Sequence, residues 1–311
     1  MPAAIATQNA TGFLYDAVII GGGPAGLSAA LVLGRCVRHV AVCDSGRYRN
    51  ECSSALHCFL SRDGIPPSEL LGESRRQLER YDTVCLLSAK VTAVERRDGN
   101  FAVTTEDGHT LQARNLLVAT GVVDELPNIE GIDDLFGHSV HVCPYCDGWE
   151  HRNASIAIYG RGTKGAGLAL LIRQWSDDVV LCTDGEKLLP AEHRRLGGRG
   201  VKVREDGIRK LHGEDGCLAE IEFGDGTRLA RRALFFNTDQ HPRSPILERL
   251  GCAFDDDGGV RCSETGETSI PGVFAAGDVS RDAQLAIIAA AEGARAALAI
   301  NKRLLEADGG L

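Results

Sequence analysis

Two cysteines separated by two residues carry the strongest chemical signal of the sequence, in the segment Cys143-Pro-Tyr-Cys146. Two thiols at this spacing can close a disulfide within one turn. If Cys146 lies in the first turn of a helix, the N-terminal field favours its thiolate, which is the nucleophile of disulfide exchange. Asp147 follows directly and could move a proton, and His141 could assist thiol deprotonation. The segment therefore predicts a redox-active cysteine pair.

Two other interpretations of this segment stay open. His138, His141, Cys143 and Cys146 place four residues of zinc-ligand type within nine positions. Alternatively, the two cysteines are buried and inert. The other nine cysteines show no such spacing, and we expect most of them to be small hydrophobic residues in strands or core.

A glycine motif near the N-terminus predicts a dinucleotide site. Gly21, Gly23 and Gly26 follow an apolar run, residues 17–20, and open a pattern with helical spacing. In such a motif the first glycine permits a tight turn, the second lets backbone N–H groups approach a pyrophosphate, and the third allows close helix–strand packing. The helix N-terminus then faces the phosphates. Asp44 ends the next predicted strand and can accept hydrogen bonds from a ribose.

The same unit is repeated later in the chain. Gly160, Gly162 and Gly165 follow a predicted strand, residues 155–159, and Asp184 ends the next one. The repeat predicts an α/β fold of two nested, Rossmann-like, doubly wound domains. We expect the first domain at residues 1–123 and 244–311, the second inserted at 124–243, and hinges near 122–125 and 240–245. Gly277-Asp278 after an apolar strand adds a further phosphate-and-sugar signal in the first domain.

Composition excludes several classes of protein. The 311 residues are 43% hydrophobic and 25% charged, which is typical of a globular protein, and the net charge of −9 argues against a nucleic-acid partner. An odd count of 11 cysteines argues against a secreted disulfide framework. Glycines and a proline at 21–24 interrupt the most apolar stretch, so we expect no membrane span. Residues 1–12 contain no Lys or Arg and predict no signal peptide, which favours the cytoplasm.

Together these motifs resemble the low-molecular-weight thioredoxin reductases over nearly the whole chain. The resemblance implies FAD in the first domain, a pyridine-nucleotide-type second domain and a homodimer. It implies that Cys146 lies nearest the flavin and that Cys143 exchanges with substrate, which favours a redox role over a metal site. The residues that the resemblance assigns to FAD binding are Gly21, Gly23, Pro24, Ala25, Asp44, Ser45, Asn50, His57, Val91, Ala119, Thr120, Gly121, Gly277, Asp278, Gln284 and Leu285.

The sequence departs from the reductases in its second domain. Where they carry His-Arg-Arg for the 2′-phosphate of NADPH, this chain has Cys182-Thr-Asp184-Gly185, and an acid there favours a free ribose if a nucleotide binds at all. Arg161 and Lys164 place bulk inside the second glycine motif. The Pro-Tyr pair between the cysteines and the following Trp149-Glu150 resemble a branch of the family, the FAD-dependent dithiol oxidases of the gliotoxin, holomycin and romidepsin type.

Three functions follow as hypotheses. The first is a dithiol oxidase, which closes a disulfide in a small-molecule dithiol and passes the electrons through FAD to O2. The second is a reductase, in which NAD(P)H supplies electrons that reach a thioredoxin-like protein through the cysteine pair. The third is a flavoprotein redox sensor or binding partner, which would require an extra interaction segment that the chain lacks at its short termini.

Overall fold

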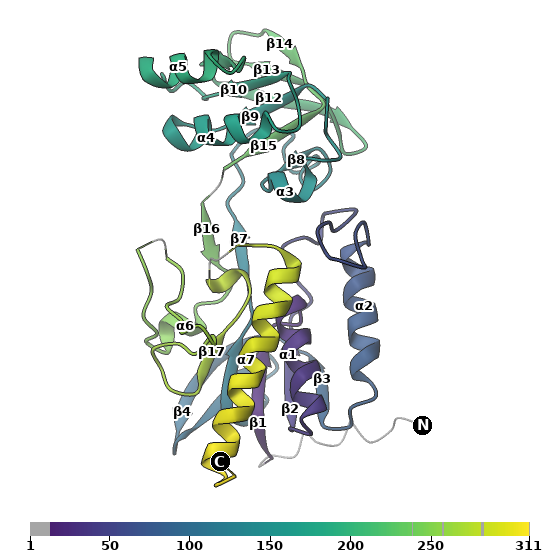
Figure 1. Cartoon of the computed structure of the whole chain (residues 1–311), viewed down its shortest axis with the longest axis vertical. Coiled ribbons are helices and arrows are strands. Elements are labelled where there is room, and N and C mark those ends of the chain that lie inside the picture. Colours follow the sequence, from purple (N-terminus) through teal and green to yellow (C-terminus); the bar gives the residue numbers. More distant parts are fainter. Residues whose placement is uncertain (1–12, 238, 257, 281–282, 311) are drawn as a thin grey trace.

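Two helix-covered β-sheets, one above the other in Figure 1, organise the protein. The computed structural model describes residues 13–237, 239–256, 258–280 and 283–310. The predicted N-terminal tail, residues 1–13, lies outside the described residues except for Phe13. The expected α/β class with two Rossmann-type domains is confirmed.

The lower sheet has seven strands, in the order β3-β2-β1-β6-β5-β4, with β17 also paired to β6. All pairings among β3, β2, β1, β6 and β17 are parallel, whereas β4 and β5 extend the sheet as an antiparallel meander. The strands are β1 (Leu14–Ile20), β2 (Val40–Asp44), β3 (Val84–Ser88), β4 (Val91–Arg97), β5 (Asn100–Thr105), β6 (Thr110–Val118) and β17 (Val273–Ala275).

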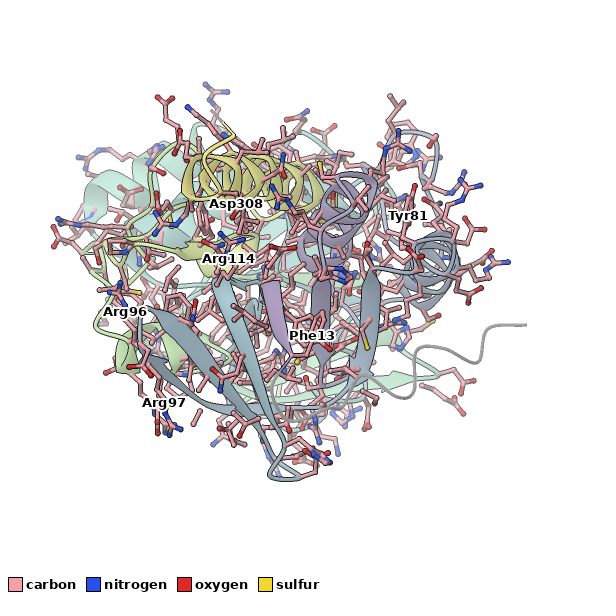
Figure 2. The ribbon with its side chains drawn as sticks, turned by 90° about the horizontal axis from the view of Figure 1, so that it is seen from below. Phe13, Tyr81, Arg96, Arg97, Arg114 and Asp308 are labelled. Carbon is pink, nitrogen blue, oxygen red and sulfur yellow. A yellow bond between two sulfur atoms is a disulfide. The ribbon has the colours of Figure 1, made fainter. Side chains whose placement is uncertain are left out.

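Helices α1 (Pro24–Arg35) and α7 (Ala286–Ala307) pack against each other on one face of this sheet. Their backbones approach so closely that a Cβ at Gly293 would lie 1.9 Å from the carbonyl oxygen of Ala25. The small residues of α7 therefore serve close packing, as its Ala-rich sequence predicts. Seen from below, an ion pair of 2.6 Å between Arg114 of β6 and Asp308 joins the C-terminal end of α7 to the sheet (Figure 2).

The remaining helices of the lower body are short or peripheral. Helix α2 lies beside α1, and α6 and the 3-10 helix η1 lie in the C-terminal part of the chain. Their bounds are α2 (Pro67–Leu78), α6 (Ile246–Arg249) and η1 (Asp278–Ser280).

The upper body repeats the arrangement around a five-stranded parallel sheet in the order β11-β10-β9-β15-β8, with a three-stranded antiparallel sheet of β12, β13 and β14 beside it. The strands are β8 (Val140–His141), β9 (Ile156–Tyr159), β10 (Val179–Cys182), β11 (Lys202–Arg204), β12 (Ile208–Glu214), β13 (Cys217–Phe223), β14 (Arg228–Ala230) and β15 (Ala233–Phe236). The helices are α3 (Pro144–Asp147), α4 (Gly162–Ile172) and α5 (Pro190–Gly197). Helix α3 lies on the side that faces the lower body (Figure 1).

Three sequence-based assignments of strands and helices were wrong. The sequence predicts one strand from the alternating residues 110–113 and another from the apolar residues 115–119, but they form the single strand β6, which pairs with β5 at its start and with β1 along its length. It predicts that residues 201–203 begin an antiparallel meander that continues through 219–223, but β11 pairs with β10, and the first meander strand is β12. It predicts that the helix after the second glycine motif begins at residue 166, but α4 begins inside that motif, at Gly162.

A two-stranded antiparallel ribbon connects the two bodies. It pairs β7 (Val122–Asp124) with β16 (Gln240–Pro242), and both lie between the sheets in Figure 1. These two strands lie within the segments expected as hinges, residues 122–125 and 240–245, and their role as hinges stays a prediction. The domain boundaries at residues 124 and 243 stay a prediction. No helix among the described residues is long and apolar enough to cross a membrane.

Candidate active site

The cysteine pair is closed as a disulfide at the start of α3. Cys143 is the N-cap residue and Cys146 lies in the first turn, with their Cα atoms 5.3 Å apart. The backbone N–H of Cys146 donates to Cys143 Sγ over 3.1 Å, so it favours negative charge on this sulfur when the bond opens. In the described part of the chain, no group of three or more His, Cys, Asp and Glu side chains is arranged to hold a metal ion, so the zinc interpretation gains no support.

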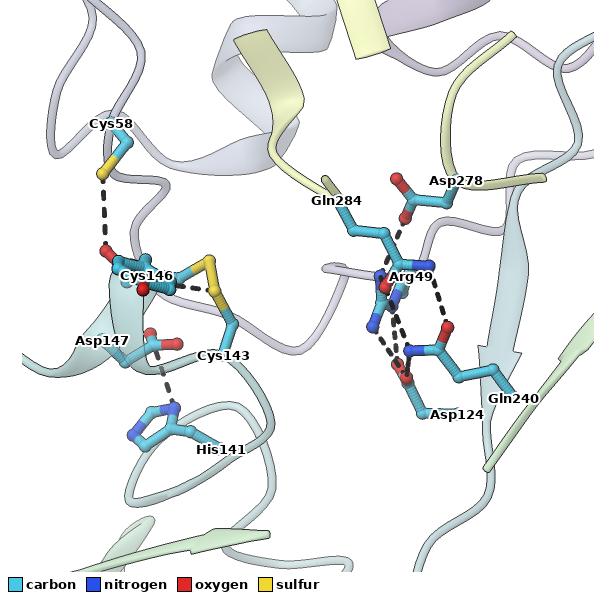
Figure 3. The surroundings of a disulfide bond; sticks show 11 residues. Arg49, Cys58, Asp124, His141, Cys143, Cys146, Asp147, Gln240, Asp278 and Gln284 are labelled. Carbon is cyan, nitrogen blue, oxygen red and sulfur yellow. Dashed lines mark hydrogen bonds and ion pairs between the residues drawn. A yellow bond between two sulfur atoms is a disulfide. The ribbon is translucent and has the colours of Figure 1, made fainter. Parts of the chain in front are cut away.

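A row of three ionisable side chains lies behind the disulfide, with His141 buried and Asp147 and His151 half-buried. Asp147 Oδ1 is 3.4 Å from His141 Nδ1 (Figure 3). On the other side of the ring, His141 Nε2 is 2.9 Å from His151 Nε2. Burial raises the pKa of Asp147 to about 7, with a further increase from Glu150 and an opposing effect from His57. Burial and the neighbouring His151 lower the pKa of His141 to about 3. Asp147 can therefore accept and release a proton near neutral pH, while His141 stays uncharged.

This geometry changes what His141 can do. Its two ring nitrogens face Asp147 and His151, and the residue comes from β8, where only 5% of the side chain is exposed. A direct role in deprotonating a cysteine, as the sequence suggested, is less compatible with these contacts than an indirect role through Asp147.

The loop between β2 and α2 reaches across to the disulfide from the lower body. Cys58 Sγ donates to the carbonyl oxygen of Tyr145 over 3.4 Å, and His57 Nε2 lies 3.5 Å from Glu150 Oε1. His57 Nδ1 also lies 3.5 Å from Asp63. These contacts bring the lower body against the segment that carries the cysteine pair.

A cavity of about 1060 Å³ joins the disulfide to the first glycine motif. All four residues predicted for catalysis line it, namely His141, Cys143, Cys146 and Asp147. All sixteen residues predicted for cofactor binding line it as well: Gly21, Gly23, Pro24, Ala25, Asp44, Ser45, Asn50, His57, Val91, Ala119, Thr120, Gly121, Gly277, Asp278, Gln284 and Leu285. The fold brings them together because strand ends and adjoining loops from both bodies meet there, although their individual roles stay predictions.

The first glycine turn has the shape of a pyrophosphate cradle. Gly21 has φ +114°, and a Cβ there would lie 2.3 Å from the carbonyl oxygen of Ala119. A Cβ at Gly23 would meet no atom within 4 Å, and in the described chain no side chain caps the N-terminus of α1. The free N–H groups of α1 therefore face the cavity, where an anion would satisfy them. Thr120 Oγ1 is buried without a hydrogen-bond partner among the described residues, which also suits a polar ligand.

Asp44 is more engaged than the sequence suggested. Its carboxylate accepts hydrogen bonds from the Tyr48 hydroxyl, from the Gly46 N–H over 3.0 Å and from Arg75 over 2.8 Å. Burial opposes ionisation, but these donors hold the pKa of Asp44 below its ordinary value. A ribose would share this ionised carboxylate with Arg75 and Tyr48.

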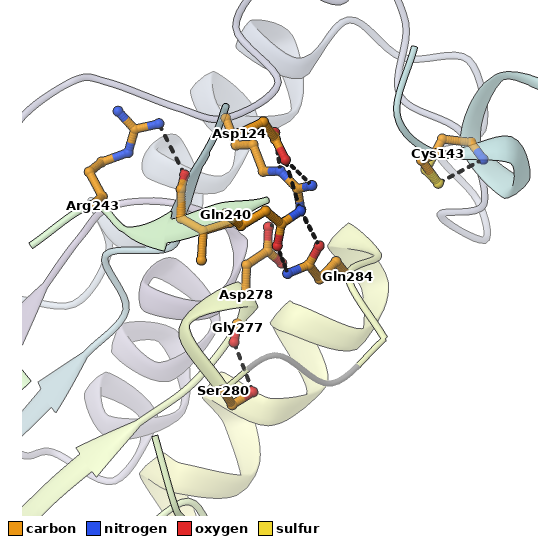
Figure 4. Close-up of polar contacts among 11 residues, drawn as sticks. Asp124, Cys143, Gln240, Arg243, Gly277, Asp278, Ser280 and Gln284 are labelled. Atoms are coloured by element: carbon orange, nitrogen blue, oxygen red, sulfur yellow. Dashed lines mark hydrogen bonds and ion pairs between the residues drawn. A yellow bond between two sulfur atoms is a disulfide. The ribbon is translucent and has the colours of Figure 1, made fainter. Parts of the chain in front are cut away.

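A polar network that no sequence motif indicates lines another part of the cavity wall. Arg49 bonds Asp124, Asp278 and Gln284, and Gln240 bonds Asp124 and Gln284 (Figures 3 and 4). Asp278 and Gln284 were predicted as cofactor contacts, and Asp124 and Gln240 lie in the predicted hinges. Arg49 belongs to no motif, and no spacing signal in the sequence could have identified it.

The second glycine motif is closely packed, and its acidic residue is bound by its own domain. A Cβ at Gly165 would lie 2.4 Å from the backbone of Gly160. Asp184 accepts hydrogen bonds from Arg161 over 2.8 Å, from the Tyr159 hydroxyl over 3.0 Å and from the N–H of Ile208 over 3.0 Å. A nucleotide ribose would have to compete with these donors.

A His-Arg-Arg sequence does occur later, at residues 193–195, but it does not replace the missing site for the 2′-phosphate of NADPH. His193, Arg194 and Arg195 lie exposed on α5, as expected for a solvated helix face. His193 Nε2 is 2.9 Å from Glu205, and Arg195 is 3.5 Å from Glu192, so acidic neighbours already balance part of this charge.

Two Rossmann-type domains around a shared cavity, with a disulfide that opens into it, define a thiol–disulfide oxidoreductase. The chain belongs to the pyridine nucleotide-disulphide oxidoreductase family, whose model matches residues 15–293. Thioredoxin reductase tcpT of Claviceps purpurea is 35% identical over 281 residues, which cover 86% of this chain and 87% of that protein. Thioredoxin reductase aclD of Aspergillus oryzae is 31% identical over 304 residues, which cover 94% and 96%.

Comparison with solved structures supports the same family assignment. HlmI superimposes with a TM-score of 0.91 at 38% identity, over 94% of this chain and 93% of that one. An oxidoreductase from Agrobacterium tumefaciens superimposes with a TM-score of 0.89 at 34% identity, over 94% and 99%. The chain is therefore a thioredoxin-reductase-like enzyme, as the sequence motifs predicted.

The thioredoxin-reductase-like members of this family are flavoproteins, and FAD is the cofactor of this protein. The cavity fits this group, because the free N-terminus of α1 and the open space beside Gly23 suit its pyrophosphate. Asp44, Thr120, Asp278 and Gln284 supply polar groups to the wall of the same cavity, and the predicted contact of Asp44 with a ribose stays a prediction.

Proposed function

We propose that this protein is a dithiol oxidase, which forms a disulfide in a small molecule with O2 as the final electron acceptor. The observation that carries the proposal is the position of the Cys143–Cys146 disulfide, which opens into the cofactor cavity, while Asp184 of the second nucleotide motif is bound by its own chain. An oxidised pair in contact with a large cavity suits a substrate that arrives as a dithiol.

The exchange consists of two displacements at sulfur. A substrate thiolate attacks Cys143 Sγ, the Cys143–Cys146 bond breaks, and Cys146 leaves as a thiolate. The second substrate thiolate then attacks the substrate sulfur of the mixed disulfide, and Cys143 leaves as a thiolate that the N–H of Cys146 stabilises. The substrate loses two electrons and two protons, and the cysteine pair gains them. When bound, FAD supplies the two-electron acceptor through which these electrons reach O2, giving hydrogen peroxide.

Asp147 handles protons during the exchange. Its pKa of about 7 makes its carboxylate able to accept the proton of a substrate thiol and later release it. The neutral His141, 3.4 Å away, holds the carboxyl group in position. Asp147 is thus the proposed acid–base group, and His141 positions it.

The contacts around the disulfide favour a small substrate over a protein. Cys58 and His57 from the lower body contact Tyr145 and Glu150 beside the pair, so the disulfide faces a space between the bodies. Apolar side chains in the wall of the same cavity, including Phe136, suit a compact molecule.

Oxygen uptake tests this proposal. With dithiothreitol as substrate, the holoenzyme is expected to consume O2 and to form oxidised dithiothreitol, with one hydrogen peroxide for each disulfide. Cys143→Ser and Cys146→Ser should each abolish the activity. Cys217→Ser is the matched control, because Cys217 is exposed and outside the cavity. Unchanged oxygen uptake in Cys143→Ser would refute the proposed chemistry.

A disulfide reductase is the second candidate, because the matched relatives of Claviceps purpurea and Aspergillus oryzae carry the name thioredoxin reductase. It requires NADH or NADPH to bind at the second glycine motif. The Arg161–Asp184 contact argues against this, as does the absence of an adjacent His-Arg-Arg in the sequence.

The assembly and location of the protein belong to the same proposal. We expect a cytoplasmic homodimer, as the resemblance to the reductases implies. Sedimentation velocity of the purified holoenzyme measures the oligomeric state, and a monomer at micromolar concentration would contradict the expected homodimer.

A further inference from the structure

The chain passes between the two sheets only through the β7/β16 ribbon, as far as the described residues show. Gln240 pairs with Asp124, and Pro242 pairs with Val122, in this ribbon. Side chains of the lower body that bind either strand of this ribbon therefore influence how the upper body, with its disulfide, is held over the lower body.

Arg49 binds the first of these strands. Its Nε and Nη2 donate to the two carboxylate oxygens of Asp124, each over 2.7 Å. Its remaining nitrogen, Nη1, donates to Asp278 over 2.9 Å and to Gln284 over 2.7 Å (Figure 3). One guanidinium thus joins β7 to two residues of the lower body, and the two-fold contact with Asp124 fixes its orientation.

Gln240 brings in the second strand. Its Nε2 donates to Asp124 Oδ1 over 2.8 Å, and Gln284 Nε2 donates to Gln240 Oε1 over 2.8 Å (Figure 4). Both strands of the ribbon are therefore bonded to Gln284, either directly or through Asp124 and Arg49.

The network is well shielded from water. The side chain of Asp124 is 5% exposed, and those of Arg49 and Asp278 are 20% exposed. Charged hydrogen bonds in such surroundings are much less screened by salt than surface pairs are, and the two-nitrogen contact with Asp124 is directional. On the far side of the cavity, the contacts of Cys58 and His57 hold the same upper body. Its orientation is thus fixed at two separated points.

We propose that Arg49 is a positioning residue that locks the β7/β16 ribbon to the lower body and so holds the Cys143–Cys146 disulfide against the cofactor cavity. Because Asp278 and Gln284 line that cavity and also bind Arg49, occupation of the cavity and orientation of the upper body are coupled through the same side chains. The inference depends on the thiol–disulfide chemistry of the family and not on the direction of electron flow.

The test uses the holoenzyme and the variants Arg49→Met and Arg49→Lys. Solution X-ray scattering reports the placement of the two bodies, and anaerobic stopped-flow absorbance reports how fast dithiothreitol bleaches the flavin. Arg49→Met is expected to broaden the distance distribution and to slow bleaching by about tenfold or more, since small misplacements of reacting groups have large effects on rate. Because Arg49 also binds Asp278 and Gln284 in the cofactor cavity, its loss should weaken FAD binding as well, so both measurements are made at saturating FAD.

Controls separate positioning from a general loss of structure. Arg97→Met removes an exposed ion pair with Glu95, on a strand end away from the upper body, and should leave scattering and rate unchanged (Figure 2). Relative to Arg49→Met, Arg49→Lys should recover part of the narrow distance distribution and part of the bleaching rate, because a lysine can contact Asp124 but cannot bind it with two nitrogens. If Arg49→Met fails to fold, Arg49→Met/Asp124→Leu removes both charges and should show the same broadening.

Two results would overturn the proposal. One is a scattering curve and a bleaching rate that match those of the unmodified protein in both Arg49→Met and the double variant. The other is a large loss of FAD affinity with unchanged scattering, which would make Arg49 a cofactor-site residue only. Failure of dithiothreitol to yield O2 uptake would count against the dithiol oxidase and leave the scattering prediction in force.

Discussion

Replacing Asp147 with asparagine should stabilise the protein while it impairs the enzyme. Burial raises the pKa of Asp147 from 3.8 to about 7, so the folded state holds the proton more tightly than the unfolded state does. Protonated Asp147 therefore adds to the free energy of unfolding. This contribution is fully present below pH 3.8 and is lost as the pH rises through about 7. Asparagine stays neutral and can still face His141, so it avoids this loss.

The size of the effect follows from linkage. At about 1.4 kcal/mol for each pKa unit, a rise from 3.8 to about 7 corresponds to about 4 kcal/mol at pH 8 as an upper bound, and to about zero at pH 3. The melting temperature of Asp147→Asn should therefore exceed that of the unmodified protein at pH 8, and the difference should vanish on acidification. Loss of the proton acceptor should lower the rate of dithiol oxidation by about 10² or more and remove the titration near pH 7.

The assay is differential scanning fluorimetry across this pH range, with oxygen uptake measured in parallel. Asp177→Asn is the matched control, because Asp177 is 97% exposed in an ion pair with Arg173, and such surface pairs contribute little. The reasoning is refuted if Asp147→Asn is no more stable than the unmodified protein at pH 8, or if any gain persists unchanged at low pH.

Two substitutions test the cofactor cradle. Gly26→Ala places a Cβ 1.9 Å from the carbonyl oxygen of Gly21, so we expect this variant to be purified with little bound flavin. The ratio of flavin to protein absorbance measures the flavin content. The control is Gly72→Ala on α2, where a Cβ would enter open space, and it should raise the free energy of unfolding by up to about 1 kcal/mol. Full flavin content in Gly26→Ala would contradict this geometry. Thr120→Val removes a buried hydroxyl that lacks a partner in the described chain, so it should weaken FAD binding and leave the apoprotein as stable or more stable by about 1 kcal/mol. A lower melting temperature of the apoprotein, with FAD affinity unchanged, would exclude this role.

The sequence predicted those parts of the site that follow strand ends and short motifs. Gly21, Ala119 and Gly277 each come shortly after one of the mutually parallel strands β1, β6 and β17, and parallel strands share a carboxyl edge, so their convergence follows from topology. The disulfide was accessible to the same reasoning, because Cys143 and Cys146 are close in the chain whatever the fold.

Contacts between distant, unpatterned residues could not be predicted. Arg49 and Gln284 are 235 positions apart, and only the folded ribbon brings them together with Asp124. The strand β12 escaped because Ile208–Glu214 is largely polar and has irregular register, which weakens alternation. The orientation of His141 depends on the pairing of β8 with β15, and proximity in sequence to Cys143 carries no information about that pairing.

The most direct test of the central claim compares electron donors without oxygen. The yellow holoenzyme is mixed anaerobically with NADPH, with NADH or with dithiothreitol, and the flavin absorbance band is followed. The account predicts that only dithiothreitol bleaches the flavin rapidly, that Cys143→Ser prevents this, and that colour returns when air is admitted. Rapid bleaching by either nicotinamide, with little effect of the dithiol, would contradict the oxidase and identify a reductase.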